Sequence, residues 1–353
     1  MNKEERYQYI DSICKQKNIN SETKLYIKRY IQLNEELFGD FLDIDEVTER
    51  LLKNIRYNIK GYDIFKYHSA RRNFFKILNV NGAWLSDRRS IYLNPRRKRQ
   101  SLTSENKKLR LNSTIMHEMD HCATTKYVHI SEEEKKEYIS KIKQNIIEQE
   151  KNPIKRRIKL ARLKNVYSEI NGRLPISGIY DIRQTIDTGI GLRSLDEGII
   201  AWKQEMYDKQ LGIAPNTGYV EEKKVAKFVA EMIGKENLIK MHFNNDYSGI
   251  REAFFEKTGR DLNHLVRELN RRPKNPNPMR IMLSKIGINS LEKYFRESKK
   301  YSDTIDRNIQ QVKKNGRTDF IKKYNIDKLP LEEIDHIVGA QKKEMINRNV
   351  EER

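Results

Sequence analysis

The chain has 353 residues, of which 34% are charged and 37% hydrophobic, and its excess of Lys and Arg gives a formal net charge of +20. This hydrophobic content is low but sufficient for a core, which excludes a disordered protein and allows one large or two modest domains. No run approaches the ~18–20 apolar residues of a membrane span, and the charged residues 1–6 do not resemble a signal peptide, so we expect a cytoplasmic protein without a membrane span.

Residues 1–57 are expected to form a helical N-terminal region. Apolar side chains recur there at helical spacing, as at Ile27 and Ile31, and the pattern predicts two or three helices. Cys14 lies in this region. We expect Cys14 and Cys122 to be reduced core residues, because two cysteines are too few for a disulfide framework.

A β-hairpin is predicted next in the chain. Residues 82–85 and 90–93 are short strand-like runs, and the turn-forming residues 86–89 lie between them. A strand of this kind can present its backbone to an extended peptide, which then adds as a further strand.

A helix is predicted over residues 109–123, with Asn112 or Ser113 as its start. Its apolar side recurs at helical spacing and consists of Ile115, Met116, Met119, Cys122 and Ala123.

His117 and His121 lie on this helix, and Glu118 follows the first of them. Because one helical turn separates the two histidines, both imidazoles face the same side and can bind one metal ion. A Glu between two such histidines can act as general base on a water molecule that the metal activates, which is the pattern of zinc-dependent peptide hydrolysis. The motif therefore indicates a Zn²⁺ site.

Catalytic zinc usually takes three protein ligands, so a third is required. A metzincin would have a third His six residues after His121, where this chain has Tyr127. Asp181 and Asp187 are alternatives, but neither stands in a convincing helical setting. Glu197 is favoured, because it lies at the start of an amphipathic helical stretch.

Together these motifs resemble the gluzincin metallopeptidases, in which H-E-x-x-H is completed by a Glu on a later helix, often as N-E-G or D-E-G. The matching residues here are His117 to His121 and Asp196-Glu197-Gly198, with Ser177-Gly178-Ile179 fitting a Ser-Gly-aliphatic stretch between them. The likeness is greatest to uncharacterised gluzincin-like proteins of low-GC Gram-positive bacteria, and it covers about residues 75–270. The chain departs from the pattern at Asp120, at Trp202 and in the length between the second His and the Glu.

The resemblance implies an α+β, mostly helical fold with a zincin-like core and a small antiparallel sheet. It also implies hydrolysis of peptide bonds in a protein or peptide substrate, with Zn²⁺ held by His117, His121 and Glu197 and with Glu118 as general base.

Two further roles have several candidates. Gluzincins stabilise the oxyanion with a Tyr, His or Arg from variable places, and the candidates here are Tyr180, Tyr207, Tyr219 and His242. Asp120 and Asp196 are the carboxylates nearest to the expected ligands in sequence, and they are candidates to orient the imidazoles; a solvated helix face is an equally supported alternative.

Three regions are predicted along the chain. A helical region covers 1–57, a zincin-like metallopeptidase domain covers 58–270, and a charged helical region covers 271–353 after a Pro-rich break. A charged helical insertion at about 131–170 lies within the second. Two amphipathic helices covering the core are favoured for it over a lid.

The net charge of +20 is the strongest competing signal, because excess Lys and Arg can neutralise nucleic-acid phosphates. Only residues 96–99 and 155–159 are densely basic, and neither run lies in a recognisable nucleic-acid module. A solvated basic surface is favoured, and a basic rim would equally steer acidic protein substrates. The alternative function is a basic nucleic-acid-associated or interaction protein whose zinc site is structural or inactive.

Overall fold

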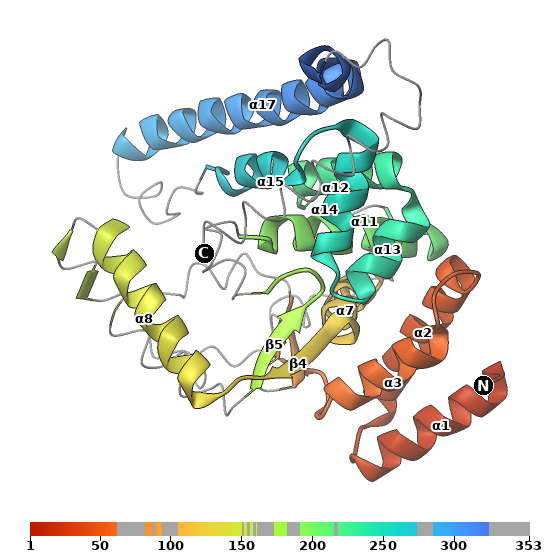
Figure 1. Ribbon diagram of the computed structural model, residues 1–353. Coiled ribbons are helices and arrows are strands. Elements are labelled where there is room, and N and C mark those ends of the chain that lie inside the picture. Colours follow the sequence, from red (N-terminus) through yellow and green to blue (C-terminus); the bar gives the residue numbers. More distant parts are fainter. Residues whose placement is uncertain are drawn as a thin grey trace. The chain divides into compact units, whose positions relative to one another are not determined.

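The computed structural model (Figure 1) describes residues 1–61, 82–86, 89–93, 105–149, 152–153, 156–157, 160, 173–181, 191–214, 218–273 and 285–324. Helices dominate these residues, and the strands form two small sheets. The predicted α+β, mostly helical class is confirmed at this level. In the described part of the chain no helix is both long enough and apolar enough to cross a membrane.

The chain divides into two compact units. Unit 1 comprises Met1–Gly189, Ile200–Gly218 and Phe243–Asn245, and unit 2 comprises Ile190–Ile199, Tyr219–His242 and Asp246–Arg353. The three-region division at residues 57 and 270 stays a prediction.

Three helices begin unit 1, as predicted, and they are α1 (Lys3–Gln16), α2 (Ser21–Phe38) and α3 (Ile44–Asn54). Each begins after a side chain that accepts a hydrogen bond from a first-turn backbone amide, namely Asn2, Asn20 or Asp43. Apolar residues of all three helices, such as Ile10, Ile27 and Leu51, are fully buried.

The first sheet contains the predicted hairpin. Its strands are β1 (Lys60–Gly61), β2 (Gly82–Leu85) and β3 (Ser90–Leu93), in the order β1-β3-β2. Strands β2 and β3 pair antiparallel, which confirms the hairpin, but β1 pairs with β3 in parallel. The small antiparallel sheet content is as predicted, and β1 is a two-residue parallel addition from a distant segment that carries no local hairpin signal.

The second sheet follows the motif helix directly. Strand β4 (Thr125–His129) pairs antiparallel with β5 (Arg173–Ser177). The register places Thr125 opposite Ser177, so the residues after the motif helix lie beside the Ser-Gly-Ile stretch.

The motif helix is α7 (Glu105–Thr124), which packs against α2, α3 and β2 in unit 1. It begins at Glu105 rather than at Asn112 or Ser113, so the predicted start is wrong. Ser113 lies inside the helix, where its hydroxyl and carbonyl both accept hydrogen bonds from Gln204 and cap no helix end.

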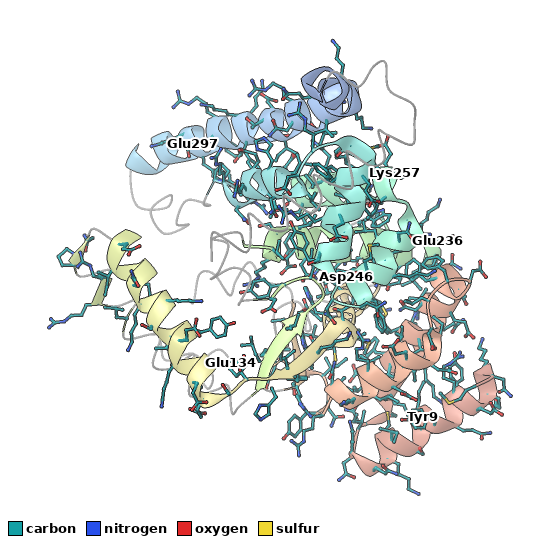
Figure 2. The ribbon with its side chains drawn as sticks, viewed as in Figure 1. Tyr9, Glu134, Glu236, Asp246, Lys257 and Glu297 are labelled. Atoms are coloured by element: carbon teal, nitrogen blue, oxygen red, sulfur yellow. The ribbon has the colours of Figure 1, made fainter. Side chains whose placement is uncertain are left out.

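The predicted insertion contains α8 (Glu132–Gln149). Ser131 and Glu134 form a reciprocal capping box at its start, with backbone-to-side-chain distances of 2.7 and 3.1 Å. Figure 2 labels Glu134 on this first turn. Residues 161–170 lie outside the described residues. That the insertion consists of two helices covering the core, and not of a lid, stays a prediction.

Helix α11 (Arg193–Gln210) contains the predicted amphipathic stretch around Glu197. The later helices are α12 (Val220–Ile233), α13 (Lys235–Phe243), α14 (Tyr247–Thr258), α15 (Leu262–Asn270) and α17 (Lys285–Tyr324). In unit 2, α17 packs along α12, α14 and α15 (Figure 1). The predicted C-terminal helix is present over 285–324, and residues 274–284 and 325–353 lie outside the described residues.

Candidate metal centre

His117 and His121 stand on the same side of α7, as their spacing predicts. Their rings are 5.0 Å apart between centroids and meet edge to face, with an interplanar angle of 71°. His117 is buried and His121 is half-buried. The helix therefore presents two imidazoles together.

Glu197 completes a group of three. The potential ligand atoms of His117, His121 and Glu197 all lie within 4.8 Å of one another. Glu197 belongs to α11, an unbroken helix whose residues Lys203 and Gln204 contact α7. Because seven residues are about two helical turns, Glu197 and Gln204 share one side of α11.

Gln204 orients the first imidazole. Its side-chain amide nitrogen donates to the Ser113 carbonyl at 3.1 Å and hydroxyl at 2.6 Å, which directs its Oε1 to Nδ1 of His117 at 3.1 Å. An amide oxygen only accepts, so Nδ1 of His117 carries the proton and Nε2 keeps the lone pair that a metal needs.

Ser177 lies against the second imidazole. Its hydroxyl is 3.3 Å from Nδ1 of His121, which leaves Nε2 of that ring as the ligand atom. Sequence reasoning named Ser177 only as part of a family-like stretch, and it missed Gln204. The two-turn spacing from Glu197 is the signal that would have found Gln204.

Asp120 has a different role from the one considered for it. Its Oδ1 accepts from the Tyr30 hydroxyl at 2.7 Å, from the Lys203 ammonium at 2.5 Å and from the Tyr207 hydroxyl at 3.2 Å. Asp120 is 0% exposed and Lys203 1% exposed. This buried ion pair ties α11 to α7 and sets the side of α11 that faces the histidines.

Tyr207 belongs to the same buried cluster. Its hydroxyl oxygen also lies 3.1 Å from Oδ1 of Asn34, so the single hydroxyl proton has two acceptors within reach. Burial, followed by the nearby Asp120 carboxylate, raises the pKa of Tyr207 well above its usual range. A phenol in this setting serves packing between helices and does not present a donor to a substrate.

His242 and Asp196 pair with each other in unit 2. Nε2 of His242 is 2.9 Å from Oδ1 of Asp196, and His242 is 0% exposed. Asp196 thus contacts His242, whose side chain has no exposed surface, and the roles predicted for both residues stay predictions.

Tyr180 and Tyr219 are both half-buried and stay candidates for the oxyanion donor. Tyr180 closes a tight turn with Ser177, to which its backbone amide donates at 2.8 Å. Tyr219 precedes α12 with a left-handed backbone (φ 55°). Of the two alternative third ligands, Asp181 is buried and is not part of the His-His-Glu group, and Asp187 lies outside the described residues.

Gly198 explains the D-E-G pattern in physical terms. A Cβ at this position would stand 2.3 Å from the Glu222 carbonyl oxygen and 2.6 Å from its carbon. Within unit 2, α11 and α12 therefore approach more closely than any side chain allows, immediately after Glu197. The glycine is needed for packing beside the ligand.

No protein-family model, no curated protein and no solved structure matches the chain. The chemistry of the site rests on its own geometry.

The donor set fits zinc. Imidazole nitrogen and carboxylate oxygen are common zinc ligands, and bonds of about 2.0–2.2 Å in a tetrahedron place donor atoms roughly 3.3 Å apart. The ligand atoms of the three side chains all lie within 4.8 Å of one another, which is near that spacing. Nδ1 of each histidine faces a protein group, so Nε2 of each ring is the atom that would bind the ion.

Glu118 is buried beside this group and contacts β2. Its Oε2 accepts from the backbone amide of Trp84 at 2.7 Å. The predicted general base is therefore fixed by a strand of the first sheet.

Proposed function

We propose that the chain is a zinc-dependent metallopeptidase that hydrolyses peptide bonds in a protein or peptide substrate. The proposal rests on one observation, the convergence of His117, His121 and Glu197. Among the residues that the structure describes, three side chains could bind the ion, which would leave one coordination position for water or substrate. This is the pattern of catalytic zinc, whereas structural zinc usually has four protein ligands.

Zinc, when bound, lowers the pKa of its water to about 7 and polarises a substrate carbonyl. Glu118 accepts the proton of the attacking water and passes it to the leaving amine. Gln204 and Ser177 hold the two imidazoles in the orientation that directs Nε2 to the ion. Tyr180 and Tyr219 are the candidates that stabilise the oxyanion.

The experiment compares wild type with Glu118→Gln. The substitution preserves shape and removes basicity, so zinc content and fold should be kept while the peptidase rate falls at least ~10²-fold. Cleavage sites are mapped across a proteome by labelling new amino termini, with zinc measured in the same preparations. Glu133→Gln, an exposed change on α8, is the matched control and should cleave like wild type. Equal cleavage by Glu118→Gln and wild type would remove Glu118 from the mechanism.

A second candidate function is binding to nucleic acid, and one surface favours it. On α17, Phe295 is 64% exposed and helps to line a shallow hollow. The lining is mostly basic and consists of Phe295, Arg296, Lys299, Lys300, Asp303 and Arg307. Cations beside an exposed aromatic ring suit phosphates and stacked bases. Absence of cleavage by wild type, together with nucleic-acid binding that weakens steeply with salt, would favour this function over peptide hydrolysis.

A further inference from the structure

Strand β2 presents one backbone amide to Glu118. In the antiparallel register, Trp84 lies opposite Ile91 of β3. The amide of Trp84 donates to Oε2 of Glu118 at 2.7 Å, so this N–H points away from β3. Because the hydrogen bond comes from the main chain, it fixes the carboxylate relative to the strand and not to a flexible side chain.

Gly82, two residues earlier in β2, leaves the space that Glu118 fills. A Cβ on Gly82 would stand 3.1 Å from Cγ and 3.3 Å from Oε1 of Glu118, and 2.9 Å from Cγ2 of Thr114. Successive residues of a strand face opposite sides, so positions 82 and 84 share the side that faces α7. The strand thus contacts Glu118 at two points.

Trp84 also binds the end of α7. Its indole nitrogen donates to the Thr125 hydroxyl at 3.1 Å, and that hydroxyl donates to the His121 carbonyl at 2.6 Å. The carbonyls of a last helical turn need such partners. One residue of β2 therefore holds both Glu118 and the turn that carries the second histidine.

We infer that Trp84 and Gly82 are positioning residues for the general base. The Trp84 amide holds Glu118, and the missing side chain at position 82 lets the carboxylate lie against the strand. This inference rests on the proposed function, because it concerns the base of that reaction. A displacement of about 1 Å at a reacting group can cost ~10²-fold in rate, so small changes in β2 should act on kcat.

The first test measures hydrogen exchange and does not depend on zinc or activity. The chain has two Trp, so ¹⁵N-Trp labelling gives two backbone amide signals, from Trp84 and Trp202. In wild type the Trp84 amide should be protected, and Glu118→Ala should accelerate its exchange at least ~10-fold, because it removes the acceptor. The amide of Trp202, within helix α11, reports whether the fold is kept. Unchanged Trp84 exchange in a folded Glu118→Ala variant would overturn the inference.

The second test separates positioning from packing. Gly82→Ala should lower kcat at least ~3-fold with KM and zinc content unchanged, because the new Cβ forces the Glu118 side chain to shift by a few tenths of an ångström. In the double variant with Thr114→Ser, the methyl group that lies closest to the new Cβ is removed, while the contact between that Cβ and Glu118 remains. If the double variant stays slow, the displaced base is the cause. If it recovers wild-type kcat, the loss came from packing against Thr114 and the inference is wrong.

The two proposals fail in different ways. If the chain has no peptidase activity but its Trp84 amide loses protection in Glu118→Ala, the proposed function is contradicted and the contact between β2 and Glu118 stands. An active chain whose Trp84 amide does not respond contradicts only the positioning inference.

Discussion

Replacing Lys203 by Met tests whether the buried ion pair orders the site. Lys203 and Asp120 are both almost completely buried, with Nζ and Oδ1 2.5 Å apart. At an effective dielectric constant of about 20, their attraction is roughly 7 kcal/mol, and the cost of desolvating Lys203 offsets part of it. Loss of one partner of a buried pair typically costs ~3–5 kcal/mol. The low end is expected here, because Tyr30 and Tyr207 still donate to the carboxylate.

The assay is urea unfolding at pH 7, with thermal unfolding beside it. Lys203→Met should lose ~3 kcal/mol, which corresponds to a fall in Tm of roughly 6–12 °C for a unit of this size. Lys209→Met is the matched control, because Lys209 is exposed on the same helix and should change stability by less than ~0.5 kcal/mol. Adding Asp120→Asn to Lys203→Met should recover part of the loss, since no buried charge then remains. If Lys203→Met is as stable as Lys209→Met, the pair does not hold α11 and the reasoning fails.

Two further predictions concern Gly198 and the two cysteines. Gly198→Ala should destabilise the protein by at least ~2 kcal/mol and weaken zinc binding, because the new Cβ would lie 2.3 Å from the Glu222 carbonyl oxygen. If this variant unfolds and binds zinc like wild type, the packing argument is contradicted. Burial raises the pKa of the Cys14 thiol and raises that of Cys122 further, so both remain protonated near pH 8. Neither should react with a thiol reagent before denaturant is added, and rapid labelling of the native protein would show that one of them is accessible.

The local patterns of the sequence predict local structure well. The hairpin over 82–93 follows from two strand-like runs around a turn, and the paired imidazoles follow from helical geometry alone. Glu197 lies far along the chain from His121, and its selection needed both the amphipathic pattern and the family resemblance.

Features that depend on distant partners could not be read from the sequence. The burial of Lys203 is one such feature, because a lysine is almost never buried unless another element supplies a counter-charge, and here Asp120 of α7 does so. Ser113 could cap a helix start by its residue type, but in the structure it lies inside α7 and bonds to Gln204 of α11. The contact between Gln204 and His117 could not be read from the sequence either, because it depends on how α11 packs against α7.

The central claim is that His117, His121 and Glu197 bind one zinc ion. The direct measurement is zinc titration of the metal-stripped protein by competition with a chelating dye, with Asp181→Ala as control for a buried carboxylate outside the group. Wild type should bind about one zinc per chain, His121→Ala should lose most of it, and Glu197→Ala should weaken binding much more than Asp181→Ala. Absence of zinc binding by wild type, or equal losses in Glu197→Ala and Asp181→Ala, would contradict the account.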